Sequence, residues 1–224
     1  ACGNCGGTVT DPLLCEGTVL DGGGVMTWGV HEYATKTVQY TNGIQLEWMT
    51  ENCHYADEAL YSNQNTSWNT TGRWAIYGYP ELMSDGVSEI DGFWVKYGGL
   101  YNYNIINSIK PDGWRLPTEE EFMGLLDLQD VQGNIVFTVN DLCSVEDWEV
   151  GQGGSNDSLM NFKGGGRIFS DGSTGGAQKA YYVVKSGNPR KRVTFQSDSN
   201  SIEVQENSAL ASVRLVREVV DAEV

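Results

Sequence analysis

The sequence contains few basic residues and no long apolar segment. Its 224 residues include only 14 lysines and arginines against 30 aspartates and glutamates, so the formal net charge is −16. A surface with this charge repels phosphate, so we expect no nucleic-acid partner. No apolar run approaches the roughly 20 residues that a membrane-spanning helix requires, and we therefore expect no membrane span.

Histidine is also scarce, which argues against hydrolytic chemistry. His31 and His54 are the only two histidines in the chain. A hydrolase triad needs a histidine base beside a nucleophile, and neither residue lies in a recognisable nucleophile motif. We interpret both as surface or strand-end residues, and we expect no catalytic residue, no metal ligand and no cofactor.

Calcium is the one metal ion that the acidic residues could bind. Carboxylate oxygens are the hard ligands that calcium prefers, although in a chain this acidic such groups are also typical of solvated loop tips. Two groups have suitable spacing: Asp85, Glu89 and Asp91, and Glu146, Asp147 and Glu149.

Three of the five cysteines lie in the first fifteen residues. The spacing of Cys2 and Cys5 is typical of metal or redox sites, but no second pair or histidine follows nearby, so we do not expect zinc there. Neighbouring glycines favour a small disulfide-stapled knot, and the odd number leaves one thiol free or paired with another chain. The disulfide candidates are Cys2, Cys5, Cys15, Cys53 and Cys143. This cysteine usage favours export, so we expect an extracellular protein.

Residues 113–126 carry the clearest local signal. Thr118 and Glu121 have the spacing of a capping box, in which each side chain accepts a hydrogen bond from the other residue's backbone N–H. Pro117 keeps the preceding residue extended, so a helix is predicted from Thr118 to about Gln129. Phe122 then begins an apolar face at helical spacing.

The flanking segments are predicted to contain strands and one more helix. Asn42-Gly43 lies between alternating apolar segments and predicts a two-residue β-hairpin. Apolar residues recur every fourth position from Tyr101 to Ile109, which indicates a helix. The last forty residues are predicted to form a β-meander from segments 181–184, 192–195, 202–204 and 211–217.

Several motifs together resemble a known family. The run Gly-Trp-Arg-Leu-Pro-Thr-Glu-x-Glu-Phe at 113–122 is similar to the central signature of the Fibrobacter succinogenes major paralogous (FISUMP) domain. Four further segments resemble motifs of this family and occur in the same order along the chain. They are Trp-Met-x-Glu-Asn at 48–52, Tyr-Gly-x-Leu-Tyr at 97–101, the loop 162–169 and Ser-Val-Arg at 212–214. The group belongs to the C-type-lectin-like and formylglycine-generating-enzyme-like superfamily. The resemblance implies an α+β, C-type-lectin-like fold in which two helices flank short antiparallel β-sheets with long loops.

The resemblance also implies roles for individual residues. The enzyme branch uses a cysteine pair near the C-terminus, whereas this chain has no cysteine after Cys143, so we expect no such activity. The residues to which we assign structural roles are Trp48, Glu51, Asn52, Tyr97, Trp114, Arg115, Pro117, Thr118, Glu121 and Arg214.

The domain organisation follows from these matches. We expect a Gly/Cys-rich N-terminal arm at 1–24, a FISUMP-like domain at 25–219 and a tail at 220–224. The predicted function is a non-enzymatic binding or adhesion module, of the bacterial surface or phage fibre type. Its partner would be a host or cell-surface glycan or protein, or copies of itself. The alternative is a structural subunit of a surface filament or virion fibre, assembled through the arm.

Loops on a rigid frame are where recognition usually occurs, so ligand contacts are expected at residues 140–180. The candidate ligand-binding residues are Trp148, Phe162, Arg167 and Tyr181. The basic residues Lys185, Arg190, Lys191 and Arg192 form a cluster on a predicted hairpin. This cluster could dock an acidic glycan or subunit, or could be a solvated turn.

Overall fold

The computed structural model shows a protein that is mostly β-sheet. It describes residues 18–20, 24–55, 74–76, 94, 96–130, 132–146, 148, 153–169, 174–175, 179–187, 189–198, 201–207 and 209–219. Among the described residues, strands account for 37% and helices for 14%, and a curled antiparallel sheet dominates the architecture. The predicted α+β, C-type-lectin-like fold with two flanking helices is therefore wrong.

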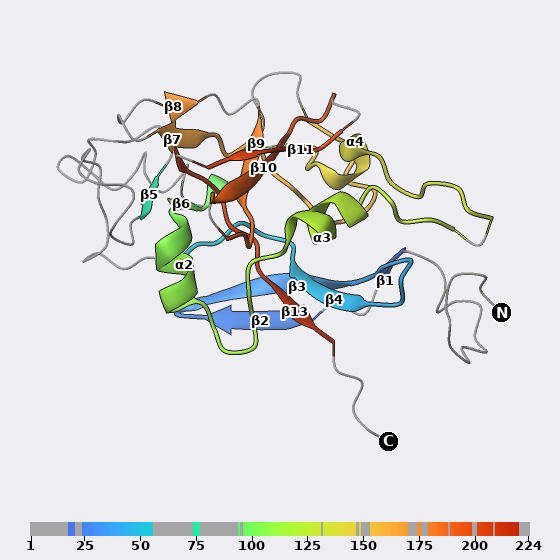
Figure 1. Cartoon of the computed structure of the whole chain (residues 1–224), viewed down its shortest axis with the longest axis horizontal. Helices are drawn as coiled ribbons and strands as arrows, with labels where there is room; N and C mark the ends of the chain where they lie inside the picture. Colours follow the sequence, from blue (N-terminus) through green and yellow to red (C-terminus); the bar gives the residue numbers. More distant parts are fainter. Residues whose placement is uncertain are drawn as a thin grey trace.

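Within the described ranges, short strands and short helices alternate along the chain (Figure 1). In chain order they are β1 (Thr18–Leu20), β2 (Val25–Trp28), β3 (His31–Gln39), β4 (Gln45–Met49), β5 (Trp74–Ile76), β6 (Gly99–Tyr101), α2 (Tyr103–Ile109), α3 (Glu119–Gly124), α4 (Val139–Leu142), β7 (Arg167–Phe169), β8 (Thr174–Gly175), β9 (Ala180–Val183), β10 (Lys191–Phe195), β11 (Glu203–Glu206), β12 (Ala209–Leu210) and β13 (Val216–Glu218).

The largest sheet has the strand order β1-β3-β4-β13, and β2 also pairs with β3. The predicted hairpin is confirmed, because β3 and β4 pair antiparallel, but its two-residue turn is wrong. Tyr40 N–H donates to the Ile44 carbonyl, so the loop holds three residues, 41–43, and of these only Gly43 has a positive φ, +85°, which glycine adopts without steric cost. Strand β13, from the end of the chain, lies beside β4 with Val216 opposite Trp48. The sheet therefore pairs two strands, β4 and β13, that lie about 170 residues apart in the sequence.

The predicted C-terminal meander is correct only for its first three strands. β9, β10 and β11 pair in sequence as one antiparallel sheet. The segment predicted as the fourth strand, 211–217, does not continue the antiparallel order. Ser212 forms a parallel bridge with Tyr182 of β9, and the end of the segment belongs to β13, which pairs with β4. Just before it, β12 pairs with β7.

The second predicted helix is real but shorter than expected. α3 ends at Gly124, and the following turns use tighter bonds in which Leu125 N–H donates to the Phe122 carbonyl and Leu126 N–H to the Met123 carbonyl. The chain then leaves the helix because Val136 N–H pairs with the Leu128 carbonyl. The first helix is confirmed as α2, which is capped by the Asn102 side chain.

Helix α3 packs its apolar side against the main core. Phe122 and Leu125 are fully buried, and the Phe122 ring meets Trp48 edge-on with centroids 5.0 Å apart. Figure 1 shows α3 above β3 and β4 and close to β10. Val213 is also fully buried, and its carbonyl accepts a hydrogen bond from Cys53 N–H. The capped helix and the closing segment therefore hold the core together.

Some predictions fall partly outside the described residues. Within the predicted arm, β1 pairs with β3 of the same chain, so residues 18–20 belong to the main sheet. Apart from Gly24, the other arm residues lie outside the described part, and so does the tail at 220–224. The same holds for five of the possible calcium ligands: Asp85, Glu89, Asp91, Asp147 and Glu149. None of the helices in the described ranges has the length and apolar character needed to span a bilayer.

Candidate functional site

Most of the residues predicted to be structural belong to two hydrogen-bonded networks, the first buried and the second half-buried. In the first, the Asn52 amide joins three segments: its nitrogen donates to the Tyr97 carbonyl at 2.8 Å, and its oxygen accepts from Tyr182 Oη at 2.8 Å and Arg214 Nε at 2.9 Å. Arg214 is fully buried and also donates to the carbonyls of Met49, Met160 and Asn161 at 2.7–3.0 Å. Burial lowers the pKa of Arg214. The cation is solvated by the protein and is not available to a ligand.

The second network is the start of α3. Thr118 N–H donates to Glu121 Oε2 at 2.7 Å and Glu121 N–H donates to Thr118 Oγ1 at 3.2 Å, so the predicted capping box is confirmed. Arg115 donates to both Glu121 oxygens at 2.8 and 2.7 Å. These hydrogen bonds, more than the charge of Glu121, raise the pKa of Arg115. Trp114 and Pro117 are buried beside this pair.

Two of the four predicted ligand contacts lie inside the core. Phe162 is fully buried and packs against Trp48 and Tyr182. Trp148 is 8% exposed, and its Nε1 donates to Ser144 Oγ at 3.0 Å. Neither side chain presents a surface to a ligand in this structure, and both contribute to core packing instead.

The other two predicted contacts, Arg167 and Tyr181, lie against each other. The guanidinium carbon of Arg167 is 4.6 Å from the centre of the Tyr181 ring and 4.1 Å from the centre of the Phe169 ring. Arg167 and Phe169 belong to β7 and are half-buried, whereas Tyr181 belongs to β9 and is buried. Aromatic faces attract cations, so the two rings hold the guanidinium in place.

A third residue, Arg192 on β10, completes this cluster. Its guanidinium carbon is 5.8 Å from the Tyr181 ring, and its side chain donates to the Glu206 carbonyl and, at 2.8 Å, to Gln205 Oε1. Arg192 faces the same side of the sheet as Tyr181, because Thr194, two residues on, lies opposite Tyr181 in the β9–β10 ladder. We call Arg167, Tyr181 and Arg192 the arginine–tyrosine cluster.

The arginine–tyrosine cluster has an excess of positive charge. Among the described residues, no carboxylate forms an ion pair with either arginine. The Nε atoms of both arginines are buried without a hydrogen-bond acceptor, and Thr194 Oγ1 likewise has no partner. Burial and the positive charge of Arg167 lower the pKa of Arg192.

The predicted basic cluster on the hairpin does not act as one surface. Lys191 Nζ pairs with Glu119 at 2.6 Å, and Arg190 donates to Asn104 Oδ1 at 2.8 Å. Only Arg192 joins Arg167. Side chains alternate between the two faces of a strand, so the sequence predicts Arg192 and Thr194 on the same face. It gives no indication that Arg167 lies close to that face.

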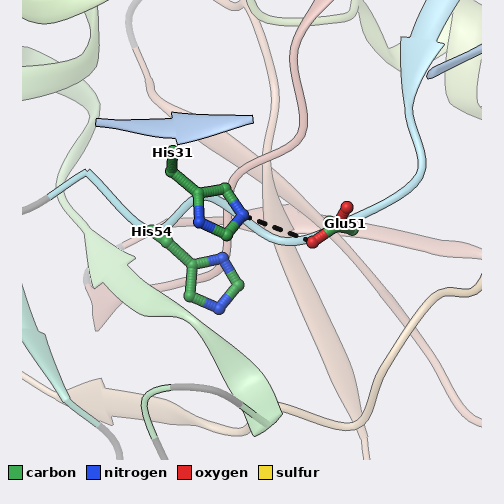
Figure 2. Close-up of side chains that lie close together, drawn as sticks. All are labelled: His31, Glu51 and His54. Atoms are coloured by element: carbon green, nitrogen blue, oxygen red, sulfur yellow. Dashed lines mark hydrogen bonds and ion pairs between the residues drawn. The ribbon is translucent and has the colours of Figure 1, made fainter. Parts of the chain in front are cut away.

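A second cluster contains both histidines of the chain (Figure 2). His31 Nε2 lies 3.4 Å from Glu51 Oε2, and the His31 and His54 rings stack with centroids 4.8 Å apart at 24°. All three side chains are half-buried, and one possible ligand atom from each lies within 4.8 Å of the others. Glu51 was predicted to be structural, and its Oε1 does accept a hydrogen bond from Ala34 N–H.

The cysteines of the described region offer no reactive thiolate. Cys53 and Cys143 are both free and fully buried, so neither forms the disulfide for which it was a candidate. Burial raises the pKa of each thiol to about 12, which keeps both protonated at neutral pH. Cys2, Cys5 and Cys15 lie outside the described residues.

The comparisons with known proteins leave the family open. No family model matches the chain, and no curated protein or solved structure matches it either. The resemblance to the FISUMP domain therefore stays a prediction based on its motifs.

Proposed function

We propose that this chain is a non-enzymatic, extracellular binding domain whose ligand is an acidic glycan. The observation that carries the proposal is the arginine–tyrosine cluster. Two guanidinium groups share one aromatic ring, and within the described ranges neither has a carboxylate counter-ion. The FISUMP-like motifs agree with an extracellular module, and they do not specify its ligand.

The charge arrangement explains why an anion would bind. Two like charges close together in a partly buried setting disfavour each other, and each also has a buried Nε donor without an acceptor. A carboxylate or sulfate group would accept charge-assisted hydrogen bonds from the half-buried Arg167 guanidinium, whereas the buried Nε atoms lie out of a ligand's reach. Arg167 is only half-buried, so it offers the accessible edge of the cluster.

The rest of the surface restricts what kind of anion fits. With a net charge of −16, the protein repels long polyanions and anionic lipid surfaces over most of its area. A short carboxylated or sulfated sugar avoids most of that repulsion because it covers only the cluster. The half-buried Phe169 ring beside Arg167 adds an apolar face on which a sugar ring can lie.

The filament alternative has less support. It requires the N-terminal arm to complete a neighbour's sheet, yet β1 already pairs with β3 of its own chain. We therefore favour the binding domain.

A glycan array containing sulfated, carboxylated and neutral sugars tests the proposal. We expect binding to acidic glycans only, and a loss of at least tenfold in affinity in Arg167→Gln. Arg190→Gln removes the same charge from a residue bonded to Asn104 and serves as the matched control. Failure of the folded protein to bind any acidic glycan, or equal binding by Arg167→Gln, would contradict the proposal.

A further inference from the structure

We propose that His31, Glu51 and His54 form a binding site for one zinc-like divalent transition-metal ion. The three residues are contributed by adjacent pieces of the β2–β3–β4 sheet and the segment that follows it. This site is independent of the arginine–tyrosine cluster. The inference does not depend on the proposed function.

The backbone brings the three residues together through strand register. Thr35 lies opposite Met49 in the antiparallel β3–β4 pair. Continuing that register toward the start of β3 places His31 level with the segment that follows β4, where Glu51 and His54 lie. At this end of the sheet His31 is also paired with Trp28 of β2.

Neighbouring groups hold each side chain in place. Glu51 Oε1 accepts from Ala34 N–H at 3.1 Å, which leaves Oε2 directed at His31. The His54 backbone N–H donates to Tyr33 Oη at 2.9 Å, and the Tyr33 ring meets the His31 ring edge-on at 4.4 Å. These contacts limit the positions of the Glu51 carboxylate and of the His31 ring, and the Tyr33 hydroxyl fixes the His54 backbone.

The distances allow a metal ion with small side-chain movements. Zinc bonds of about 2.0–2.1 Å in tetrahedral geometry separate ligand atoms by roughly 3.4 Å. The three ligand atoms already lie within 4.8 Å of one another, and His31 Nε2 and Glu51 Oε2 are at 3.4 Å. Rotation of the His54 ring out of its stack would bring the third atom within bonding distance. Figure 2 shows the His54 ring beside that of His31, with Glu51 at the far edge of His31.

The ligand set selects the class of metal. Two imidazoles and one carboxylate suit zinc, cobalt or nickel, whereas calcium and magnesium prefer all-oxygen sites. Half-burial of all three residues leaves room for water as a fourth ligand. The net charge of −16 raises the local concentration of cations. Both histidines of the chain are used, so the site would account for every imidazole that the protein has.

Zinc titration of the full chain by calorimetry tests the site. The protein is first stripped of metal with a chelator, and accessible thiols are blocked with iodoacetamide so that cysteine cannot bind zinc. We expect one zinc per chain, with affinity lowered at least tenfold in His31→Gln, His54→Gln and Glu51→Gln. Glu32→Gln is the matched control, because Glu32 is exposed, neighbours His31 and carries the same charge as Glu51. Absence of zinc binding, or unchanged affinity in both histidine variants, would overturn the proposal.

A measurement on the unmodified protein guards against variants that fail to fold. The ring protons of only two histidines appear in its NMR spectrum. One equivalent of zinc should shift or broaden the signals of both, and the same amount of calcium should shift neither. If zinc leaves either histidine signal unchanged, the three-residue site does not exist.

Discussion

Replacing Arg214 with methionine should unfold the protein far more easily than its single charge would suggest. The guanidinium is fully buried and donates to Asn52 Oδ1 and to the carbonyls of Met49, Met160 and Asn161. Methionine fills similar space but donates nothing. Each buried acceptor left unpaired costs about 1–3 kcal/mol, and three carbonyls lose a donor. Allowing for local relaxation, we expect the free energy of unfolding to fall by at least about 4 kcal/mol.

Urea unfolding followed by tryptophan fluorescence measures this loss, because Trp48 is fully buried in the main core. Arg190→Met is the control: Arg190 is half-buried and has one side-chain hydrogen bond, so a loss below about 1 kcal/mol is expected. Buried ion pairs can often be replaced by apolar residues without cost. Here the partners are backbone carbonyls that cannot be replaced with the arginine. If Arg214→Met retained wild-type stability, this reasoning would be refuted.

Three further predictions concern single residues. Thr118→Ala should lower the free energy of unfolding by about 1 kcal/mol through loss of the helix cap, and Thr118→Ser should restore most of it in the same urea experiment. Burial opposes ionisation of Asp141, but hydrogen bonds from its neighbours outweigh burial and lower the pKa of the carboxyl group. The ionised Asp141 therefore stabilises the fold at pH values above its ordinary pKa, and this stabilisation is lost as the pH falls through the lowered pKa of the folded state. Asp141→Asn should therefore unfold at lower urea concentration than wild type at pH 7, and the difference should disappear at strongly acid pH. Cys53 and Cys143 should resist iodoacetamide in the native protein and react once it is unfolded, as peptide mass spectrometry would show; rapid native labelling of either would contradict their burial.

Local features of the fold could be predicted from the sequence. The capping box at Thr118 and Glu121 and the hairpin around Asn42-Gly43 depend on residues only a few positions apart, and both are present in the structure, although the hairpin loop has three residues and not two. Locality also explains the error in helix length. Helical spacing after Phe122 continues in the sequence, but pairing of Leu128 with Val136 ends the helix early. The fold class was wrong because it was inferred from the family resemblance, whereas strands outweigh helices among the described residues.

The functional clusters depend on contacts between distant segments, which the sequence does not specify. The sequence suggests Arg167 and Tyr181 as separate ligand contacts, and their approach to Arg192 depends on how β7 meets the β9–β10 sheet. The histidine cluster was more accessible to prediction. Once the hairpin at Asn42-Gly43 is accepted, antiparallel register places His31 close to His54, and that step would have identified the pair.

The central claim is that the arginine–tyrosine cluster binds an acidic sugar. The most direct measurement is calorimetric titration of the protein with one short sulfated oligosaccharide and with its desulfated counterpart. The account predicts saturable binding of the sulfated sugar alone, weakened at least tenfold in Arg167→Gln and weakened by added salt. Equal binding of both sugars, or unchanged binding by folded Arg167→Gln, would contradict it.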